Sequence, residues 1–166
     1  MRNSIPRERL LLGGCAILRI GDLLRLKWDD VYDTDAGACR SRVTLTEKKT
    51  GKQKTIALSA QAINALCSYF PNRRGEYIFT GNRSEKPISR VQAWRIIRAA
   101  AEAIKAAGRI TCHSLRKTFG YFAWKMGVLP VMLMEIFNHS SFEITRRYLG
   151  ITQDDRDTVY IKMSLF

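Results

Sequence analysis

The most chemically dense part of the sequence lies between residues 111 and 151. His113 and Arg116 are three residues apart where helical spacing begins, so we expect their side chains one above the other on the first turn. The backbone N–H groups and the positive end of the helix dipole point the same way at that turn. An imidazole, a guanidinium and a helix N-terminus that converge on one point favour the binding of a phosphate group.

Another arginine with a nearby carboxylate stands early in the chain. Arg19 lies between Leu18 and Ile20, and an arginine in apolar surroundings is costly to bury unless an anion meets it. Asp22, three residues further on, shares a helical face with Arg19 and offers it an ion pair. The residues alone favour a salt bridge that stabilises a turn, with an external anion as the alternative.

A lysine-rich turn separates two runs that are typical of β-strands. Residues 43–46 and 55–58 flank Gly51 and predict a hairpin. With residues 28–32 as a first strand, they predict a small three-stranded antiparallel sheet near the N-terminal half. Lysines at such a tip either protect an edge strand or reach into a DNA groove. The four lysines of the turn are Lys48, Lys49, Lys52 and Lys54.

Most of the remaining chain has the apolar spacing of helices. Ser59 and Ser89 are expected to cap helices that extend to about residues 70 and 107, and residues 6–17 predict a helix start. Residues 130–137 predict a helix that is apolar on nearly all sides and therefore buried. The predicted fold class is α+β and mainly helical. Two helical stripes are expected to be covered: Leu115, Phe119, Phe122 and Met126, and near the C-terminus Val159, Met163 and Phe166.

Composition narrows the class of partner. Lys and Arg total 28 against 15 Asp and Glu, a formal charge of +13, which favours a polyanion as partner, with a basic surface kept only for solubility as the alternative. The basic residues are scattered rather than massed beside an apolar segment, which argues against a membrane surface. The four cysteines have no C-x-x-C spacing, so we expect reduced thiols and no zinc site. With 166 residues, we expect one domain.

Five ordered segments together resemble the catalytic domain of the tyrosine recombinases, the phage-integrase family. The resemblance covers residues 10–151. The H-x-L-R-x-T element is moderately specific by itself, and a histidine nine residues before a tyrosine makes the combination strong. The segments are Leu18–Leu24 (LRIGDLL), Lys48–Lys52 (KKTGK), His113–Thr118 (HSLRKT), His139–Ser141 (HSS) and Thr145–Leu149 (TRRYL).

The resemblance implies a site-specific DNA recombinase that cleaves and rejoins strands through a 3′-phosphotyrosyl intermediate. Tyr148 would be the nucleophile, and Lys49 would be the general acid that protonates the leaving 5′-oxygen. Arg19 and Arg116 would hold the scissile phosphate, a task suited to planar, permanently charged forks. No metal ion and no nucleotide cofactor are implied.

Supporting roles follow from the same resemblance. His113 would act as a proton acceptor or hydrogen-bond donor, and His139 would bond to the phosphate. Asp22 would orient Arg19. Lys48 and Lys52 are close enough to Lys49 that the choice of general acid stays open. The residues expected to contact DNA are Lys48, Lys52, Lys54 and Arg90.

The resemblance also implies an organisation. Residues 1–150 would form the catalytic domain, and residues 151–166 a C-terminal segment that is exchanged between protomers or packs on its own domain. The N-terminal core-binding domain of the family is not expected within the chain. Double-stranded DNA is the implied partner, with self-association in a tetrameric synapse, no membrane, and a cytoplasmic, nucleoid-associated place in a bacterium or phage host. Asn138 replaces a glycine of the family pattern, and asparagine is the best substitute where a left-handed conformation is needed.

Two other functions share parts of this pattern. A type IB topoisomerase-like strand transferase would use the same arginines, lysine and tyrosine without a partner site. A catalytically inactive DNA-binding remnant of a mobile element would keep only the basic surface. The H-x-L-R pattern and the histidine before Tyr148 favour the recombinase over the topoisomerase. The presence of every expected catalytic residue argues against the inactive remnant.

Overall fold

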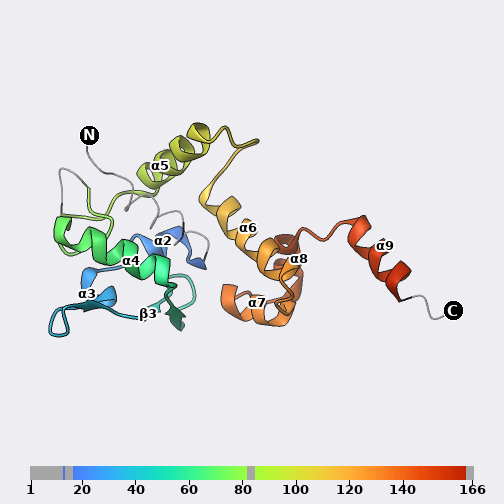
Figure 1. The fold of residues 1–166 in the computed structure, drawn as a ribbon, viewed down its shortest axis with the longest axis horizontal. Helices are drawn as coiled ribbons and strands as arrows, with labels where there is room; N and C mark the ends of the chain where they lie inside the picture. Colours follow the sequence, from blue (N-terminus) through green and yellow to red (C-terminus); the bar gives the residue numbers. More distant parts are fainter. Residues whose placement is uncertain (1–12, 14–16, 82–84, 164–166) are drawn as a thin grey trace. The chain divides into compact units, whose positions relative to one another are not determined.

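A computed structural model describes residue 13, residues 17–81 and residues 85–163 (Figure 1). The helix start predicted for residues 6–17 lies outside these described residues, apart from two positions, and so does Phe166. The chain divides into two compact units, residues 1–115 and 116–166, and the boundary falls within helix α6 (Cys112–Lys125). The domain boundaries expected from the sequence stay a prediction.

The strands of unit 1 form two antiparallel pairs among the described residues. The residues expected to form a first strand instead include helix α3 (Trp28–Val31), because the Asp30 carboxylate accepts a hydrogen bond from the Lys27 N–H in a capping box. The predicted three-stranded sheet is wrong, because the described strands form two separate two-stranded sheets. The predicted class, α+β and mainly helical, is confirmed. The pairs are β1 (Tyr32–Asp33) with β2 (Ala38–Cys39) and β3 (Arg42–Thr46) with β4 (Gln53–Ala57).

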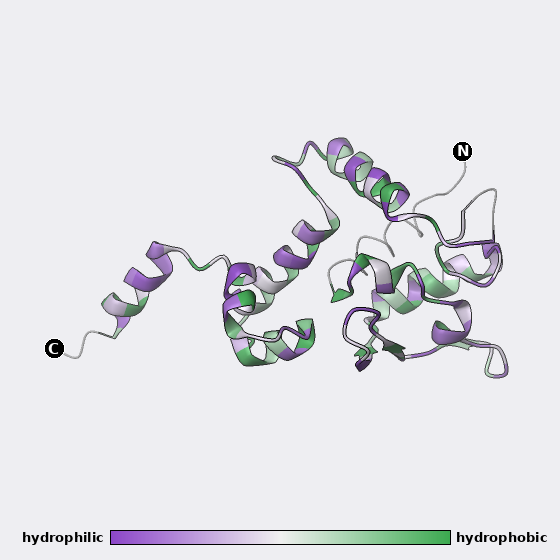
Figure 2. Ribbon diagram, turned by 180° about the vertical axis from the view of Figure 1, so that it is seen from behind, coloured by the Kyte–Doolittle hydropathy of each residue, from purple (hydrophilic) through white to green (hydrophobic). Residues whose placement is uncertain are grey.

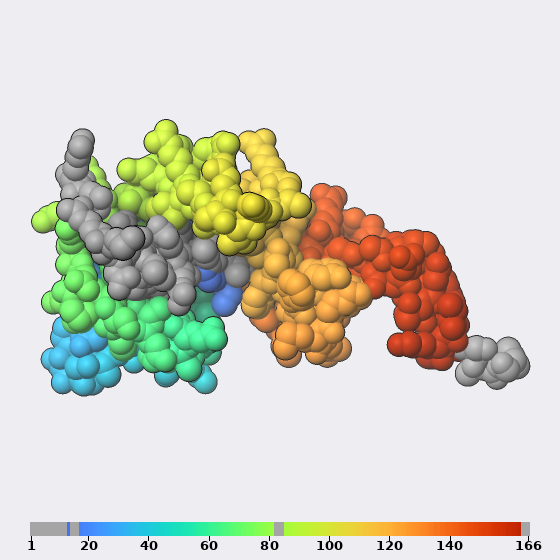
Figure 3. All heavy atoms as spheres, turned by 45° about the horizontal axis from the view of Figure 1, so that its top comes forward, coloured from blue at the N-terminus to red at the C-terminus, as the bar shows by residue number. Residues whose placement is uncertain are grey.

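Two helices of unit 1, α4 (Ala60–Tyr69) and α5 (Arg90–Ala103), begin where the sequence predicts caps. Ser59 and Ser89 accept hydrogen bonds from backbone N–H groups one turn into their helices. Helix α5 lies at the surface (yellow-green in Figure 3), although Ala93 and Ile97 on one face are buried. The helical elements are α2 (Ile20–Leu23), α4 (Ala60–Tyr69), the 3-10 turn η1 (Phe70–Asn72) and α5 (Arg90–Ala103).

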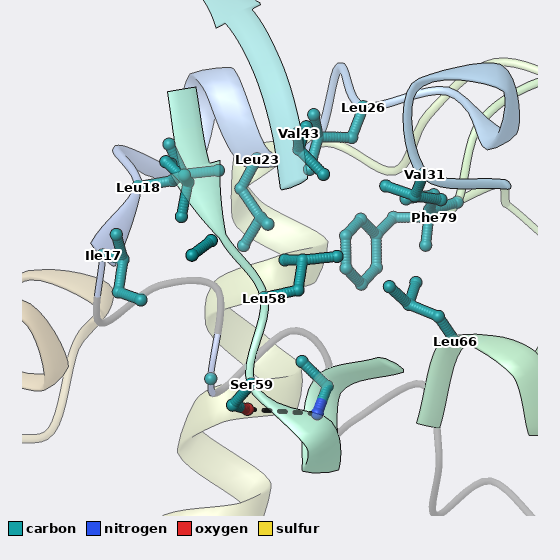
Figure 4. Close-up of a pocket in the computed structure, with 15 residues that line it drawn as sticks. Ile17, Leu18, Leu23, Leu26, Val31, Val43, Leu58, Ser59, Leu66 and Phe79 are labelled. Carbon is teal, nitrogen blue, oxygen red and sulfur yellow. Dashed lines mark hydrogen bonds between the residues drawn. The ribbon is translucent and has the colours of Figure 1, made fainter. Parts of the chain in front are cut away.

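The core of unit 1 gathers residues from most of its elements. Trp28 packs against the rings of Tyr69 and Phe70, with ring centroids 5.7 and 5.3 Å away. An apolar cavity of about 230 Å³ adjoins this core, and Figure 4 shows Leu23, Leu58 and other apolar side chains around it. Helix α2 and the β3–β4 hairpin pack on this core through Leu23 and Val43.

Unit 2 is helical, with α7 (Pro130–Phe137), α8 (Phe142–Leu149) and α9 (Gln153–Lys162) following α6. Its core consists of Leu133, Phe137 and Leu149, which are fully buried. The prediction that α7 is buried on nearly all sides is wrong, since Val131 and Met132 are more than half exposed. Helix α9 is largely hydrophilic (Figure 2). None of the described helices is both long and apolar enough to cross a bilayer.

Candidate active site

Arg116 is buried in unit 2, where it is held by the end of α7. Its Nη2 donates a hydrogen bond of 2.9 Å to the carbonyl oxygen of Phe137, and its guanidinium carbon lies 4.5 Å from the centre of the Phe137 ring. Only 5% of Arg116 is exposed. A guanidinium that is stacked and hydrogen-bonded in this way keeps one orientation, which is what a fixed oxyanion-binding fork requires.

His139 and Tyr148 lie against the same phenylalanine. The ring of Tyr148 is 4.8 Å from that of His139 and 5.4 Å from that of Phe137, measured between centroids. The Nδ1 atom of His139 shares a hydrogen bond of 3.0 Å with the hydroxyl of Thr145, a fully buried residue one turn before the tyrosine on α8. Phe137 therefore packs against all three predicted catalytic residues of unit 2.

The turn between α7 and His139 has the backbone that the sequence predicted. Asn138 ends α7 with φ 51° and ψ 50°, a left-handed conformation that asparagine tolerates better than most residues. The N–H of His139 then bonds to the carbonyl oxygen of Met134 at 3.0 Å. This closure directs the chain so that the histidine ring meets α8.

Gly120 makes room for this cluster on the facing helix. A Cβ atom at Gly120 would lie 3.1 Å from a ring carbon of Phe137 and 3.3 Å from the Cβ of Tyr148. Both distances are tighter than ordinary van der Waals contact. The absence of a side chain at Gly120 therefore lets α6 approach the tyrosine closely.

His113 stands one turn before Arg116, at the start of α6. Thr111 and Ser114 exchange backbone-to-hydroxyl hydrogen bonds of 3.2 Å, the arrangement of a capping box, so the helix begins where the sequence predicted. His113 is exposed and Arg116 buried, so the two predicted site residues differ in their access to solvent.

In unit 1, Arg19 forms an ion pair with Glu47 rather than with Asp22. Its Nη1 lies 2.6 Å from Oε2 of Glu47, and the carboxylate is 1% exposed. The same carboxylate oxygen accepts a hydrogen bond of 2.9 Å from the hydroxyl of Thr50. Asp22 instead accepts a hydrogen bond of 2.9 Å from the backbone N–H of Lys48. Two carboxylates thus join α2 to the β3–β4 hairpin.

The lysines of the turn lie on this joined segment. Gly51 adopts φ 67°, and hydrogen bonds from the Gly51 N–H to Glu47 and from the Glu47 N–H to Lys52 close the turn. Lys48, Lys49 and Lys52 are exposed, and Lys54 on β4 is half-buried. The geometry does not select one of them as the general acid.

Arg90 meets α2 from the start of α5. A Cβ atom at Gly21 would lie 3.0 Å from Nη2 of Arg90, so the guanidinium rests against the glycine that separates Ile20 from Asp22. Unit 1 therefore gathers Arg19, Asp22, Arg90 and the lysine turn. Unit 2 gathers Arg116, His139 and Tyr148, and His113, on the first turn of α6, falls at the end of unit 1.

Three residues of these groups were not predicted from the sequence: Glu47, Thr145 and Phe137. A signal for Glu47 was present, because Val43, Leu45 and Glu47 follow the two-residue period of a strand whose inner face is apolar. A carboxylate on that face must have a polar partner. No comparable signal marked Thr145. The described part of the chain contains no group of three or more His, Cys, Asp and Glu side chains that would hold a metal ion.

The chain matches the model of the phage integrase family over residues 9–154. It is 38% identical over 151 residues to a probable integrase/recombinase, YoeC, of Bacillus subtilis (strain 168), with 90% of this chain and 80% of that protein covered. It is 29% identical over 161 residues to tyrosine recombinase XerD of Mycobacterium tuberculosis (strain CDC 1551 / Oshkosh), with 92% of this chain but only 49% of that protein covered.

Solved structures show the same fold. The crystal structure of XerA recombinase superposes with a TM-score of 0.77 at 22% identity, with 98% of this chain and 60% of that chain covered. XerH recombinase bound to palindromic difH substrate gives 0.76 at 16% identity, with 96% and 46% covered. The family match spans nearly all of the described residues and both groups of predicted site residues. The chain therefore belongs to the phage integrase family.

Proposed function

We propose that this chain carries the strand-cleaving and rejoining activity of a site-specific DNA recombinase, an integrase that works through a 3′-phosphotyrosyl intermediate. The observation that carries the proposal is the cluster in unit 2, where Tyr148 contacts His139 and both lie on the phenylalanine that holds Arg116. A phenol, an imidazole and a fixed guanidinium are the groups that phosphoryl transfer to a tyrosine requires.

The proposed reaction assigns one role to each group. The Oη atom of Tyr148 attacks the phosphorus, the bond to the 5′-oxygen breaks, and Lys49 supplies the proton that the leaving oxygen takes. Arg19 and Arg116 stabilise the charge that develops on the non-bridging oxygens. The phosphotyrosyl bond keeps the energy of the phosphodiester, so the 5′-hydroxyl of another strand reverses the attack and completes the exchange.

The two histidines and Asp22 have supporting roles in the proposed reaction. His139 donates a hydrogen bond to the phosphate, and His113 accepts the phenolic proton or donates to a phosphate oxygen. Asp22 acts on the hairpin through the Lys48 N–H, a contact that ties the general acid to the helix that begins after Arg19.

Double-stranded DNA is the proposed substrate. The formal charge of +13 supplies a long-range attraction for phosphates, and XerH recombinase, which shares this fold, was solved bound to its palindromic difH substrate. We assign phosphate contacts to Lys48, Lys52, Lys54 and Arg90, and expect binding to weaken steeply with salt. The proposed place of action is the bacterial cytoplasm, at the nucleoid.

The C-terminal segment is the proposed link between protomers in a tetrameric synapse. Val159 on α9 and Met163 at its C-cap are 57% and 65% exposed, and an apolar stripe of this kind is stabilised when another surface covers it. Light scattering on DNA of a chain that lacks residues 160–166 tests this. A complex of unchanged mass would argue against the exchange.

Covalent trapping tests the chemistry. The probe is a library of duplexes with a randomised central segment, each nicked so that the short 5′-hydroxyl fragment diffuses away after cleavage. Wild-type protein should retain DNA through phenol extraction, and Tyr148→Phe should retain none. No adduct from wild type would refute the proposal, and relaxation of a plasmid that lacks the selected sequence would favour a topoisomerase.

A further inference from the structure

We infer that Glu47 is a positioning residue, whose buried carboxylate fixes the guanidinium of Arg19 for phosphate binding. The inference deepens the proposed function and rests on it, because it takes Arg19 as a ligand of the scissile phosphate. It assigns a role to a residue outside the predicted catalytic set.

The first observation is the burial of the carboxylate. Glu47 is 1% exposed, and an ionised carboxylate is costly to bury unless it is paired and hydrogen-bonded. Oε2 of Glu47 satisfies this requirement by accepting from Nη1 of Arg19 at 2.6 Å and from the Thr50 hydroxyl at 2.9 Å. Glu47 directly follows β3, and these two contacts hold its buried carboxylate in place, so it can orient the side chain that it contacts.

The second observation is the part of Arg19 that the contact uses. The ion pair engages Nη1, while Nε and Nη2 make no hydrogen bond to another described residue. The Arg19 side chain is 26% exposed. Glu47 thus holds the Nη1 end of the Arg19 guanidinium, and an incoming anion can bind to the Nε and Nη2 donors. This is the geometry of an outer partner that orients a ligand-binding side chain.

The third observation is the link to the hairpin. Thr50 belongs to the turn that carries Lys49, and the backbone of Glu47 bonds to Gly51 and Lys52 across that turn. Glu47 therefore touches both the arginine and the segment of the predicted general acid. Glu47 can act through Arg19 or through the lysine turn. The geometry favours Arg19, because that contact is an ion pair and is shorter than the contact to the Thr50 hydroxyl.

The test measures the rate of covalent adduct formation at saturating DNA, on the sequence selected by wild-type protein. Glu47→Ala should slow the reaction by about 10- to 100-fold, as the loss of an orienting partner does elsewhere, with little change in DNA affinity. Glu47→Gln keeps the shape and an acceptor oxygen and should recover part of the rate. The matched control is Glu102→Gln, which removes the exposed carboxylate of the Arg98–Glu102 pair and should react like wild type.

Two further arms separate action through Arg19 from other causes. If Glu47 acts through Arg19, the double variant Arg19→Ala with Glu47→Ala should be no slower than Arg19→Ala alone. A substrate whose 5′-bridging oxygen is replaced by sulfur needs no general acid, because thiols are far stronger acids than alcohols. That substrate should rescue Lys49→Ala and should leave the defect of Glu47→Ala in place.

Three results would each overturn the proposed role of Glu47. A wild-type rate for Glu47→Ala, a loss that multiplies with that of Arg19→Ala, or rescue by the sulfur substrate would each overturn the inference. Thermal unfolding by circular dichroism accompanies each variant, and Glu47→Gln carries the test if Glu47→Ala does not fold. Failure of wild type to form any adduct would instead refute the proposed function, so the two failures are distinguishable.

Discussion

The imidazole of His139 lies 4.8 Å from the phenol ring of Tyr148, and its Nδ1 atom is held by the hydroxyl of Thr145. The threonine and the tyrosine are three residues apart on α8, so one short helix positions both the proposed nucleophile and the hydrogen-bond partner of the histidine. The bond to Nδ1 fixes the plane of the imidazole ring.

Thr145→Val should therefore slow strand cleavage. Valine has the shape of threonine but lacks the hydroxyl, and loss of one hydrogen bond at a buried site costs about 1 kcal/mol of folding stability. We expect about a 10-fold slower rate of adduct formation, because the histidine loses its orientation. Thr145→Ser retains the hydroxyl and serves as the control. Equal rates for the valine and serine variants would show that the hydrogen bond has no part in cleavage.

Gly120→Ala should lower both stability and cleavage. Alanine favours a helix over glycine by about 1 kcal/mol. The added Cβ would press on Phe137 and Tyr148 at 3.1 to 3.3 Å, and overpacking of this kind costs about 1–3 kcal/mol, so the strain should outweigh the gain. Urea unfolding measures the first effect and covalent trapping the second. A variant more stable than wild type with full activity would contradict the tight contact.

Helix α6 shows why the candidate site was only partly predictable from the sequence. The apolar stripe suggested a buried face, yet Phe122 and Met126 are 59% and 83% exposed. The buried positions of α6 are Arg116 and Gly120, four residues apart on the same face. Hydrophobicity misjudges such a face, because one of its buried residues is a cation held by the Phe137 carbonyl and the other is a glycine with no side chain.

In unit 1 the hairpin was predictable from the sequence, but the ion pair of Arg19 was not. The hairpin and its lysine turn were predictable, because a two-residue period and a central glycine are local signals. The partner of Arg19 was not, because Glu47 is 28 residues away and its pairing depends on how α2 packs against the hairpin. Local spacing favoured Asp22 as the ion-pair partner of Arg19. In the structure the Asp22 carboxylate instead accepts a hydrogen bond from the Lys48 N–H. Long-range pairing of charges is the information that local patterns lack.

Asn138 should tolerate glycine and reject a β-branched residue. Its left-handed backbone closes α7 immediately before His139, and such a conformation costs most L-residues about 1–2 kcal/mol. Asn138→Gly should match wild type in chemical unfolding, whereas Asn138→Val should lose about that much stability and cleave more slowly as His139 shifts. Equal unfolding midpoints for the two variants would show that the turn adapts to either residue.

The ion pair between Lys125 and Asp155 joins α9 to α6 and should depend on pH. The Lys125 ammonium, followed by the N–H and hydroxyl of Thr152, lowers the pKa of Asp155 from 3.8 to about 2. Because the folded-state pKa lies below the unfolded one, the contribution of this group is complete above about pH 4. It is lost as the pH falls through about 2.

The carboxyl carbon of Asp155 reports this titration by NMR. Its midpoint should lie near pH 2 in wild type. In Lys125→Met it should move up towards the ordinary value, because methionine is of similar length but removes the charge beside the carboxylate. The same variant should release the first turn of α9, visible as faster amide exchange, and Arg156→Gln on the same helix is the control. An unchanged midpoint in Lys125→Met would mean that Thr152 alone lowers the pKa and that the ion pair does not anchor α9.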